Sequence, residues 1–258
     1  MTTRREIVTK CGAGLAAIIA AGRAPAAFIR SMLAARNGMM AGKRLPYDAE
    51  VEYLESPGTQ WIDTGVVGNE RIAIDVRWSY ASTSASTVQW GARTSVNQNS
   101  VLVAGSRGTA TDTQLYPSFG TNIPDQYAAQ SAVGNNVWEC HLENGRQDLY
   151  KDGALVLRAN NNTSSFSTVN TIPLLALWNS STQFLNRTGG RIWLCKIWED
   201  GAQIRDMIAV RLTNELGQTE GAMYDRLGVG GMNPDGSART DGLYRNRGTD
   251  AFVLGPDI

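Results

Sequence analysis

The sequence predicts an all-β domain built from two antiparallel sheets and preceded by a short helical segment. Three observations support this fold class. Apolar and polar residues alternate from Arg71 to Tyr80, which is the period of a strand with one covered face. Asp-Gly pairs, which favour tight hairpins, stand between strand-like runs at Asp152-Gly153 and Asp200-Gly201. The 27 glycines suit a chain with many tight turns.

The composition limits both the size of the fold and the class of partner. At 258 residues the chain is long enough to bury a sizeable core, and one sandwich of about a dozen short strands accounts for it. Twenty-four basic and 24 acidic residues cancel, so no overall field points to nucleic acid or to an anionic membrane. Cys140 and Cys195 lie in expected strands, where buried free thiols are favoured over a disulfide across the sandwich.

The N-terminal segment, residues 1–46, leaves two interpretations open. Arg4 and Arg5 precede an apolar run at Cys11–Ala21, and Ala24-Pro25-Ala26 has the form of a cleavage site, so the segment resembles a twin-arginine export signal. However, residues 26–36 continue as an amphipathic helix, which suits an anchor that packs on a partner or on another copy of the chain. The apolar run is too short to span a bilayer as a helix. Residues 47–258 form the expected β domain.

The β domain is expected to open with a hairpin. Glu50–Glu55 and Gln60–Thr64 are strand-like on either side of Ser56-Pro57-Gly58, a turn in which Pro fixes φ and Gly tolerates positive φ. After the alternating strand at 71–80, further strands are expected at Thr87–Arg93, Val101–Ala104, Gln114–Phe119 and Val137–Leu142.

The second half of the domain contains longer apolar runs. Leu149–Leu157 predicts a hairpin around its Asp-Gly pair. Ile172–Trp178 is nearly all apolar and predicts a strand buried on both faces, with Pro173 at its start. Arg191–Glu199 is also apolar on both faces, which predicts coverage on both sides. The chain is then expected to close through a strand at Gln203–Leu212, a glycine-rich loop at Gly228–Gly242, and short strands at Leu243–Arg245 and Ala251–Leu254.

Stretches at both ends of this domain resemble a known family. Val51–Gly65, VEYLESPGTQWIDTG, resembles the family's opening, and its ending is similar to Gly221–Asp225, Leu243–Asn246 and Gly248–Asp257. The family is the concanavalin A-like (laminin-G-like) jelly-roll domains that are associated with gut bacteria and their phages. The resemblance covers about Tyr47–Ile258. It implies a jelly-roll sandwich of two sheets that binds glycans or surfaces rather than one that catalyses a reaction.

The residue types that carry common chemistries do not form a convincing active site. A related enzyme branch cleaves glucans with two carboxylates in a Glu-x-Asp-x-x-Glu strand pattern, and the nearest match here, Glu139–Asn144, has His141 in place of the Asp and Asn144 in place of the last Glu. His141 is expected to be a half-buried strand residue. A single His and three scattered Cys lack the spacing of a zinc site. We therefore predict a non-catalytic protein, with a glycoside hydrolase as the minor alternative.

A glycan site needs a stacking aromatic ring beside planar hydrogen-bonding groups. The candidate ligand-binding residues are Trp90, Arg93 and Asn97 at one strand end, and Trp178, Asn179 and Gln183 at another. For each Trp, filling of the core is the alternative. Bound Ca²⁺ is a further candidate because jelly-roll lectins often fix a binding loop with it, and Asp63, Asp75 and Asp257 are the candidate carboxylates.

Two classes of function remain. The first is a non-catalytic module for carbohydrate or surface binding, which is extracellular or on a cell surface. The second is a structural protein or tail adhesin of a phage or prophage, docked on the virion through its N-terminal helix. The predicted partner is a glycan or cell-surface ligand, without nucleic acid and without a transmembrane span, and the same helix is a candidate for homo-oligomer formation.

Overall fold

Every regular element that the structure describes is a β-strand. The computed structural model describes residues 45–80, 87–95, 98–107, 114–120, 134–160, 164–179, 183–185, 189–228 and 230–258. Apart from Leu45, these residues belong to one compact unit, Pro46–Ile258. The predicted export signal and N-terminal helix lie outside the described residues, as does Asn97. Across the described residues, no helix has the length and apolar character needed to cross a membrane.

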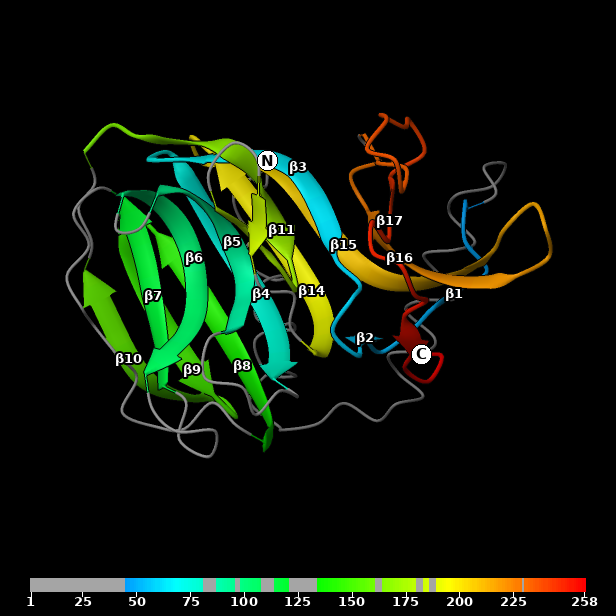
Figure 1. Cartoon of the computed structure of the whole chain (residues 1–258), viewed down its shortest axis with the longest axis horizontal. Helices are drawn as coiled ribbons and strands as arrows, with labels where there is room; N and C mark the ends of the chain where they lie inside the picture. The colour runs from blue at the N-terminus through cyan, green and yellow to red at the C-terminus, as the bar shows by residue number, and fades with distance from the viewer. Residues whose placement is uncertain are drawn as a thin grey trace, which may run out of the picture. The chain divides into compact units, whose positions relative to one another are not determined.

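The larger of two sheets is antiparallel and contains eleven strands within the described residues. Its strands are β1 (Ala49–Glu50), β2 (Leu54–Ser56), β4 (Ile72–Tyr80), β8 (Gly134–Glu143), β9 (Arg146–Lys151), β10 (Ala154–Asn160), β14 (Gly190–Glu199), β15 (Ala202–Thr213), β16 (Thr219–Asp225), β17 (Leu243–Arg245) and β18 (Val253–Leu254). The main order is β10-β9-β8-β4-β14-β15-β16-β17. The long strand β15 also pairs with β1, and β2 pairs with both β14 and β18 (Figure 1).

The smaller sheet contains seven strands within the described residues. They are β3 (Ile62–Asn69), β5 (Thr87–Ser95), β6 (Gln98–Arg107), β7 (Gln114–Gly120), β11 (Ser167–Leu174), β12 (Leu177–Asn179) and β13 (Gln183–Leu185). On one side of β5 lie β6 and then β7, and on the other side lie β11 and β12. All these pairs are antiparallel except the short contact between β5 and β12.

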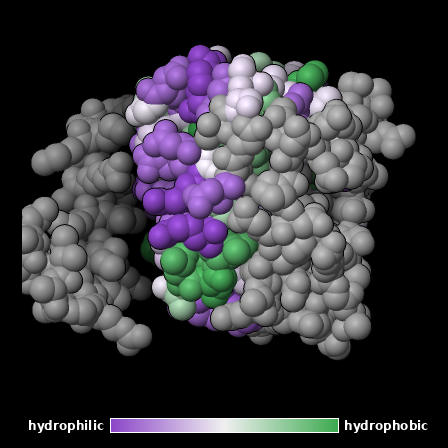
Figure 2. Space-filling model, turned by 90° about the vertical axis from the view of Figure 1, so that its left-hand side faces the viewer, coloured by the Kyte–Doolittle hydropathy of each residue, from purple (hydrophilic) through white to green (hydrophobic). Residues whose placement is uncertain are grey.

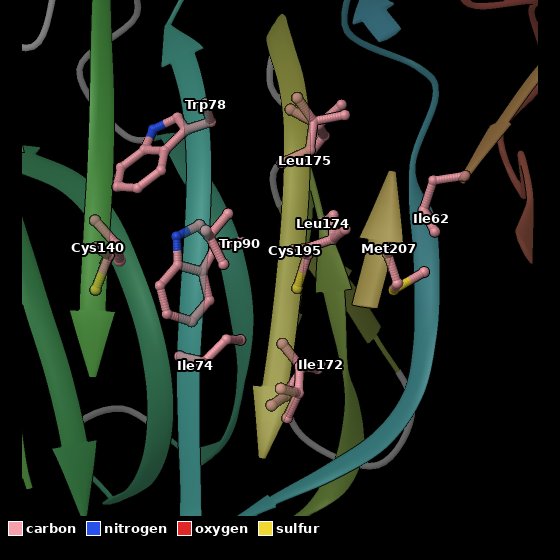
Figure 3. Packing of buried hydrophobic residues seen from close by; sticks show 14 of the residues in the cluster. Ile62, Ile74, Trp78, Trp90, Cys140, Ile172, Leu174, Leu175, Cys195 and Met207 are labelled. Atoms are coloured by element: carbon pink, nitrogen blue, oxygen red, sulfur yellow. The ribbon is translucent and has the colours of Figure 1, made fainter. Parts of the chain in front are cut away.

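The two sheets pack face to face through one continuous core (Figure 3). The alternation predicted at Arg71–Tyr80 is confirmed, because β4 buries its apolar residues: Ile72, Ile74, Val76 and Trp78. The rings of Trp78 on β4 and Trp90 on β5 meet edge to face with centroids 6.4 Å apart, so this contact joins the two sheets. Cys140 and Cys195 are buried free thiols, as predicted, and burial raises the pKa of both.

The Asp-Gly pairs form the tight hairpins predicted for them. Asp152 and Gly153 have φ of 49° and 81°, and Asp200 and Gly201 have φ of 51° and 77°. Two consecutive positive φ angles are those of a type I′ turn, whose twist matches that of the paired strands. The first turn joins β9 to β10 and the second joins β14 to β15.

The hairpin predicted at the start of the domain is wrong. Its first strand, β2, pairs with β14 and β18, whereas its second, β3, pairs with β11 in the other sheet. The turn itself forms, since Ser56 Oγ accepts a hydrogen bond from the Gly58 amide at 3.0 Å and Gly58 has φ of 128°. Turn residues fix a local reversal of the chain, but the partner strands of β2 and β3 lie about 100 or more positions away in the sequence.

The apolar run Ile172–Trp178 is two strands rather than one. Residues 172–177 are buried, as predicted. However, Leu175 has φ of 61°, which breaks the extended backbone between β11 and β12. Pro173 lies near the end of β11, opposite Asp63, and not at the start of the strand. The break lets the chain leave its antiparallel neighbour β3 and pair in parallel with β5.

Strand β10 forms one edge of the large sheet, on the side that Figure 2 shows. Most of the described surface on this side is hydrophilic, and one apolar patch interrupts it (Figure 2). The larger apolar residues of β10 are Leu155, which is 46% exposed, and Val156 and Leu157, which are partly exposed.

Candidate functional site

The ring of Trp90 cannot stack on a ligand. It is only 1% exposed and lies in the core against Trp78, so its predicted role as a ligand-binding residue is wrong. The physical reason is the pleat of the strand, which directs successive residues to opposite faces of the sheet. Ala92 is buried in the same layer as Trp90, whereas Arg93 is partly exposed.

The structure brings Arg93 of one predicted glycan site and Asn179 and Gln183 of the other into one row of the small sheet. Asn179 lies opposite Arg93 on one side and opposite Gln183 on the other. Trp178 lies one residue earlier, opposite the buried Ala92, and is therefore in the core-facing register. It is half-buried, and its ring meets that of Trp61 at 6.0 Å. The Trp90 ring and the Arg93 side chain thus lie on opposite faces of β5.

The three candidate calcium ligands do not come together. Asp63 is buried and pairs with Arg247 at 2.7 Å, whereas Asp257 pairs with Arg211 at 2.8 Å. Asp75 bonds to His141. Among the described residues, no group of three acidic, Cys or His side chains could hold a metal ion. The prediction of a calcium site at these carboxylates therefore has no geometric basis.

A row of charged side chains crosses the outer face of the large sheet. This charge row consists of Arg158, Asp148, His141, Asp75, Lys196, Asp206 and Arg226. The first six are cross-strand neighbours on β10, β9, β8, β4, β14 and β15, and the last follows β16. Basic and acidic positions alternate along it, with the imidazole in a basic position. Opposite charges on facing strands stabilise a sheet and hold the side chains in place.

Short contacts fix most of the charge row. His141 Nδ1 and Asp75 Oδ1 are 2.8 Å apart. Arg158 donates two hydrogen bonds to Asp148, at 2.8 and 2.9 Å, and this guanidinium holds the pKa of the Asp148 carboxyl below its usual value. Lys196 makes no ion pair with any residue in the described part of the chain. Its ammonium group therefore remains available to a ligand.

Aromatic rings flank the charge row on both sides. Trp193 on β14 lies between the Arg77 guanidinium, 5.6 Å from its ring centroid, and the ring of Tyr53 at 5.5 Å. Trp198, on the same strand, lies on the other side of the row, where it pairs with Ala73 of β4. Its neighbour Ile197 is buried in the core, so Trp198 is directed outward.

Two adjoining depressions lie along the charge row. The larger, about 440 Å³, is lined by Asp75, His141, Glu143 and Trp198 together with small or apolar residues. The smaller, about 210 Å³, shares the Asp75 and His141 positions and adds Arg77, Glu139, Leu194 and Lys196. The Glu143 side chain makes no hydrogen bond or ion pair within the described residues, so it is a free acceptor beside the ring of Trp198.

Sequence reasoning missed this face for a specific reason. The strand at Arg191–Glu199 was expected to be covered on both sides, but Trp193, Leu194 and Trp198 are only partly buried. Lys196 lies between Leu194 and Trp198 on the same face, and this lysine was the signal that the face is open. His141 was expected to be a half-buried strand residue, and its side chain is 46% exposed on this face.

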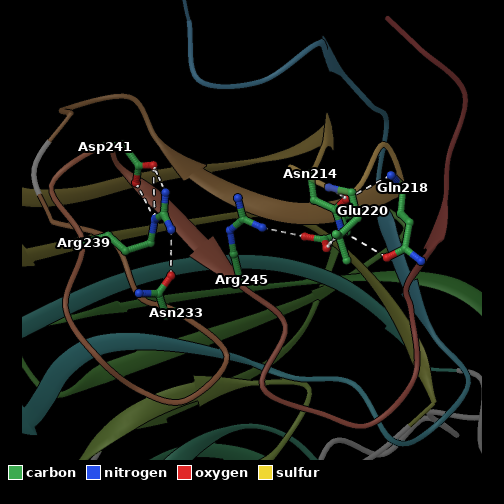
Figure 4. Close-up of polar contacts among 8 residues, drawn as sticks. Asn214, Gln218, Glu220, Asn233, Arg239, Asp241 and Arg245 are labelled. Atoms are coloured by element: carbon green, nitrogen blue, oxygen red, sulfur yellow. Dashed lines mark hydrogen bonds and ion pairs between the residues drawn. The ribbon is translucent and has the colours of Figure 1, made fainter.

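A further depression, about 490 Å³, lies near the C-terminal end and is lined by Glu220, Arg245 and Asp250 among others. These three charged groups already have partners, and Asp250 accepts a hydrogen bond from Thr59 at 2.6 Å. Arg245 donates to Glu220 at 2.7 Å, and Asn214 also donates to this carboxylate (Figure 4). Phe252, the aromatic residue in its lining, is only 6% exposed. This depression therefore offers a ligand fewer free groups than the outer face of the large sheet.

Neither a family model nor a curated protein matches the chain. The function is therefore inferred from the described geometry. That geometry favours the outer face of the large sheet, where two adjoining depressions are lined by a partly exposed indole and by a carboxylate and an ammonium that pair with no described residue.

Proposed function

We propose that the chain is a non-catalytic carbohydrate-binding module of the concanavalin A-like jelly-roll type, which acts in adhesion outside the cell. The proposed binding surface is the outer face of β8, β4 and β14. The observation that carries the proposal is the larger depression, in which the Trp198 ring lies beside Asp75, His141 and Glu143. An indole face packs on the C–H groups of a sugar, while carboxylates and imidazole bond to its hydroxyl groups.

The arrangement of the strands supports the jelly-roll assignment. The stretches that resemble the two ends of the family lie next to each other, because β18 pairs with β2 through Val253 with Glu55 and Leu254 with Leu54. Two packed sheets with one shared core are the architecture that this resemblance implies.

The spacing of Glu139 and Glu143, the two carboxylates of the stretch that is similar to the glucanase pattern, supports a non-catalytic role. Glu139 and Glu143 lie on one face of β8, four residues apart, which corresponds to roughly 13 Å along a strand. A glycosidase needs its two carboxyl groups about 5–9.5 Å apart. Glu139 is also close to two basic groups, Arg77 at 3.5 Å and His141 at 3.8 Å.

Replacing Trp198 with alanine is expected to weaken glycan binding about tenfold, because the variant loses the aromatic face of the site. The measurement is a glycan array followed by titration of the tightest ligand. The matched control is Trp178→Ala, which removes a half-buried indole from the small sheet and should leave binding unchanged. The opposite pattern, with binding lost only in Trp178→Ala, would place the site on the small sheet.

The alternative function is a structural protein of a phage or prophage, docked through its N-terminal helix. One feature of the described residues favours association with other subunits: the edge strand β10 carries the exposed Leu155 beside Val156 and Leu157. The N-terminal mass of the native protein separates the two functions. Cleavage near Ala26 supports export, whereas an intact N-terminus in a purified particle supports the structural role.

A further inference from the structure

We propose that the ligand of the large sheet's outer face is a saccharide that carries a protonated amino group, bound in the larger depression. This inference rests on the proposed function and adds the chemical class of the sugar. Among the described residues that line this depression, the charged side chains are Asp75 and Glu143, and none is Lys or Arg. The depression therefore favours a cation over an anion.

The hydrogen bonds that these side chains already make also favour a cationic ligand. His141 bonds to one oxygen of Asp75, and Glu143 makes no hydrogen bond or ion pair in the described residues, so carboxylate oxygens remain for an ammonium group. Trp198 adds an indole, the aromatic side chain that attracts a cation most strongly. An ammonium held by both a carboxylate and an indole face is bound more tightly than the hydroxyl or acetamide group that replaces it in other sugars.

The smaller depression contains basic side chains, so the two depressions together favour one orientation of the bound ligand. Arg77 and Lys196 line it, and Lys196 has no ion-pair partner in the described part of the chain. Because the two depressions adjoin at Asp75 and His141, an oligosaccharide can occupy both. One amino group then lies at the Trp198 end, and hydroxyl oxygens of a sugar unit at the other end accept hydrogen bonds from Lys196.

Three β-1,4-linked pentamers test the inference by calorimetric titration at neutral pH: those of glucosamine, N-acetylglucosamine and glucose. The glucosamine pentamer is expected to bind the full chain about tenfold more tightly than the other two. In Glu143→Gln, the three pentamers are expected to bind with nearly equal affinity, so the ratio of affinities falls close to one. Glu215→Gln, which removes an exposed carboxylate outside the depression, is the matched control and should keep the ratio.

The outcomes distinguish a failure of the amino-sugar inference from a failure of the glycan-binding function. If the glucose or acetylated pentamer binds as tightly as the glucosamine pentamer, or if the preference persists in Glu143→Gln, the amino-sugar inference fails and the glycan-binding function stands. If none of the three pentamers binds, both fail. A lysine-containing peptide that binds more tightly than every pentamer would also overturn the inference, since the amine would then belong to a protein.

Discussion

Replacing Trp90 with alanine is expected to lower the free energy of unfolding by about 3–5 kcal/mol, the usual cost of removing a large aromatic side chain from a core. The Trp90 ring is 1% exposed and meets Trp78 at 6.4 Å across the interface between the sheets. The variant therefore loses buried apolar area and leaves a cavity where the two layers touch. Chemical denaturation followed by circular dichroism measures the change.

The matched control for this prediction is Trp178→Ala. Trp178 is half-buried at its position opposite Ala92, so its removal should cost less than that of Trp90. The packing would be contradicted if Trp90→Ala kept the stability of the parent protein and instead abolished glycan binding. That result would restore Trp90 as an exposed ligand-binding residue.

Arg247→Ala is expected to cost about 3–5 kcal/mol, because it leaves a buried carboxylate without its cation. The Asp63 side chain is only 4% exposed, and Arg247 Nη1 lies 2.7 Å from its Oδ2. The guanidinium also lies over the ring of Trp61, 4.9 Å from its centroid. The pair joins strand β3 to the segment that follows β17, so thermal unfolding should begin at a lower temperature.

The chain contains a matched control for this ion pair. Arg211 and Asp257 are 2.8 Å apart, but their side chains are 38% and 53% exposed. Arg211→Ala should therefore cost no more than about 1 kcal/mol. If the two variants lost equal free energy of unfolding, the burial of Asp63 would not contribute to the strength of its ion pair. The double variant Asp63→Asn with Arg247→Ala is expected to be more stable than Arg247→Ala alone, since no buried charge remains.

Local patterns predicted the elements that depend on neighbouring residues. The alternating strand β4 and the hairpins at Asp152-Gly153 and Asp200-Gly201 each follow from a few adjacent positions. The pairing of β2 was not predictable in this way. Its Ser56 lies opposite Gly190, more than 100 residues away, and no turn motif carries that information.

The candidate site could not be predicted from local sequence patterns either. The residues of the charge row are spread over the sequence from Asp75 to Arg226. Only the register of the sheet shows that they lie side by side with alternating charges. The aromatic ring of the site was not identified for a related reason. Trp90 beside Arg93 matched the composition of a glycan site, but composition does not distinguish the two faces of a strand. Trp198 was expected to be buried because its strand is apolar on both faces.

The most direct test of the proposed binding face is amide hydrogen exchange of the full chain, with and without its tightest glycan ligand. Binding at the outer face of the large sheet predicts that the ligand slows exchange in β8, β4 and β14. Slower exchange confined to β5, β12 and β13, or to the C-terminal depression around Glu220 and Arg245, would contradict it.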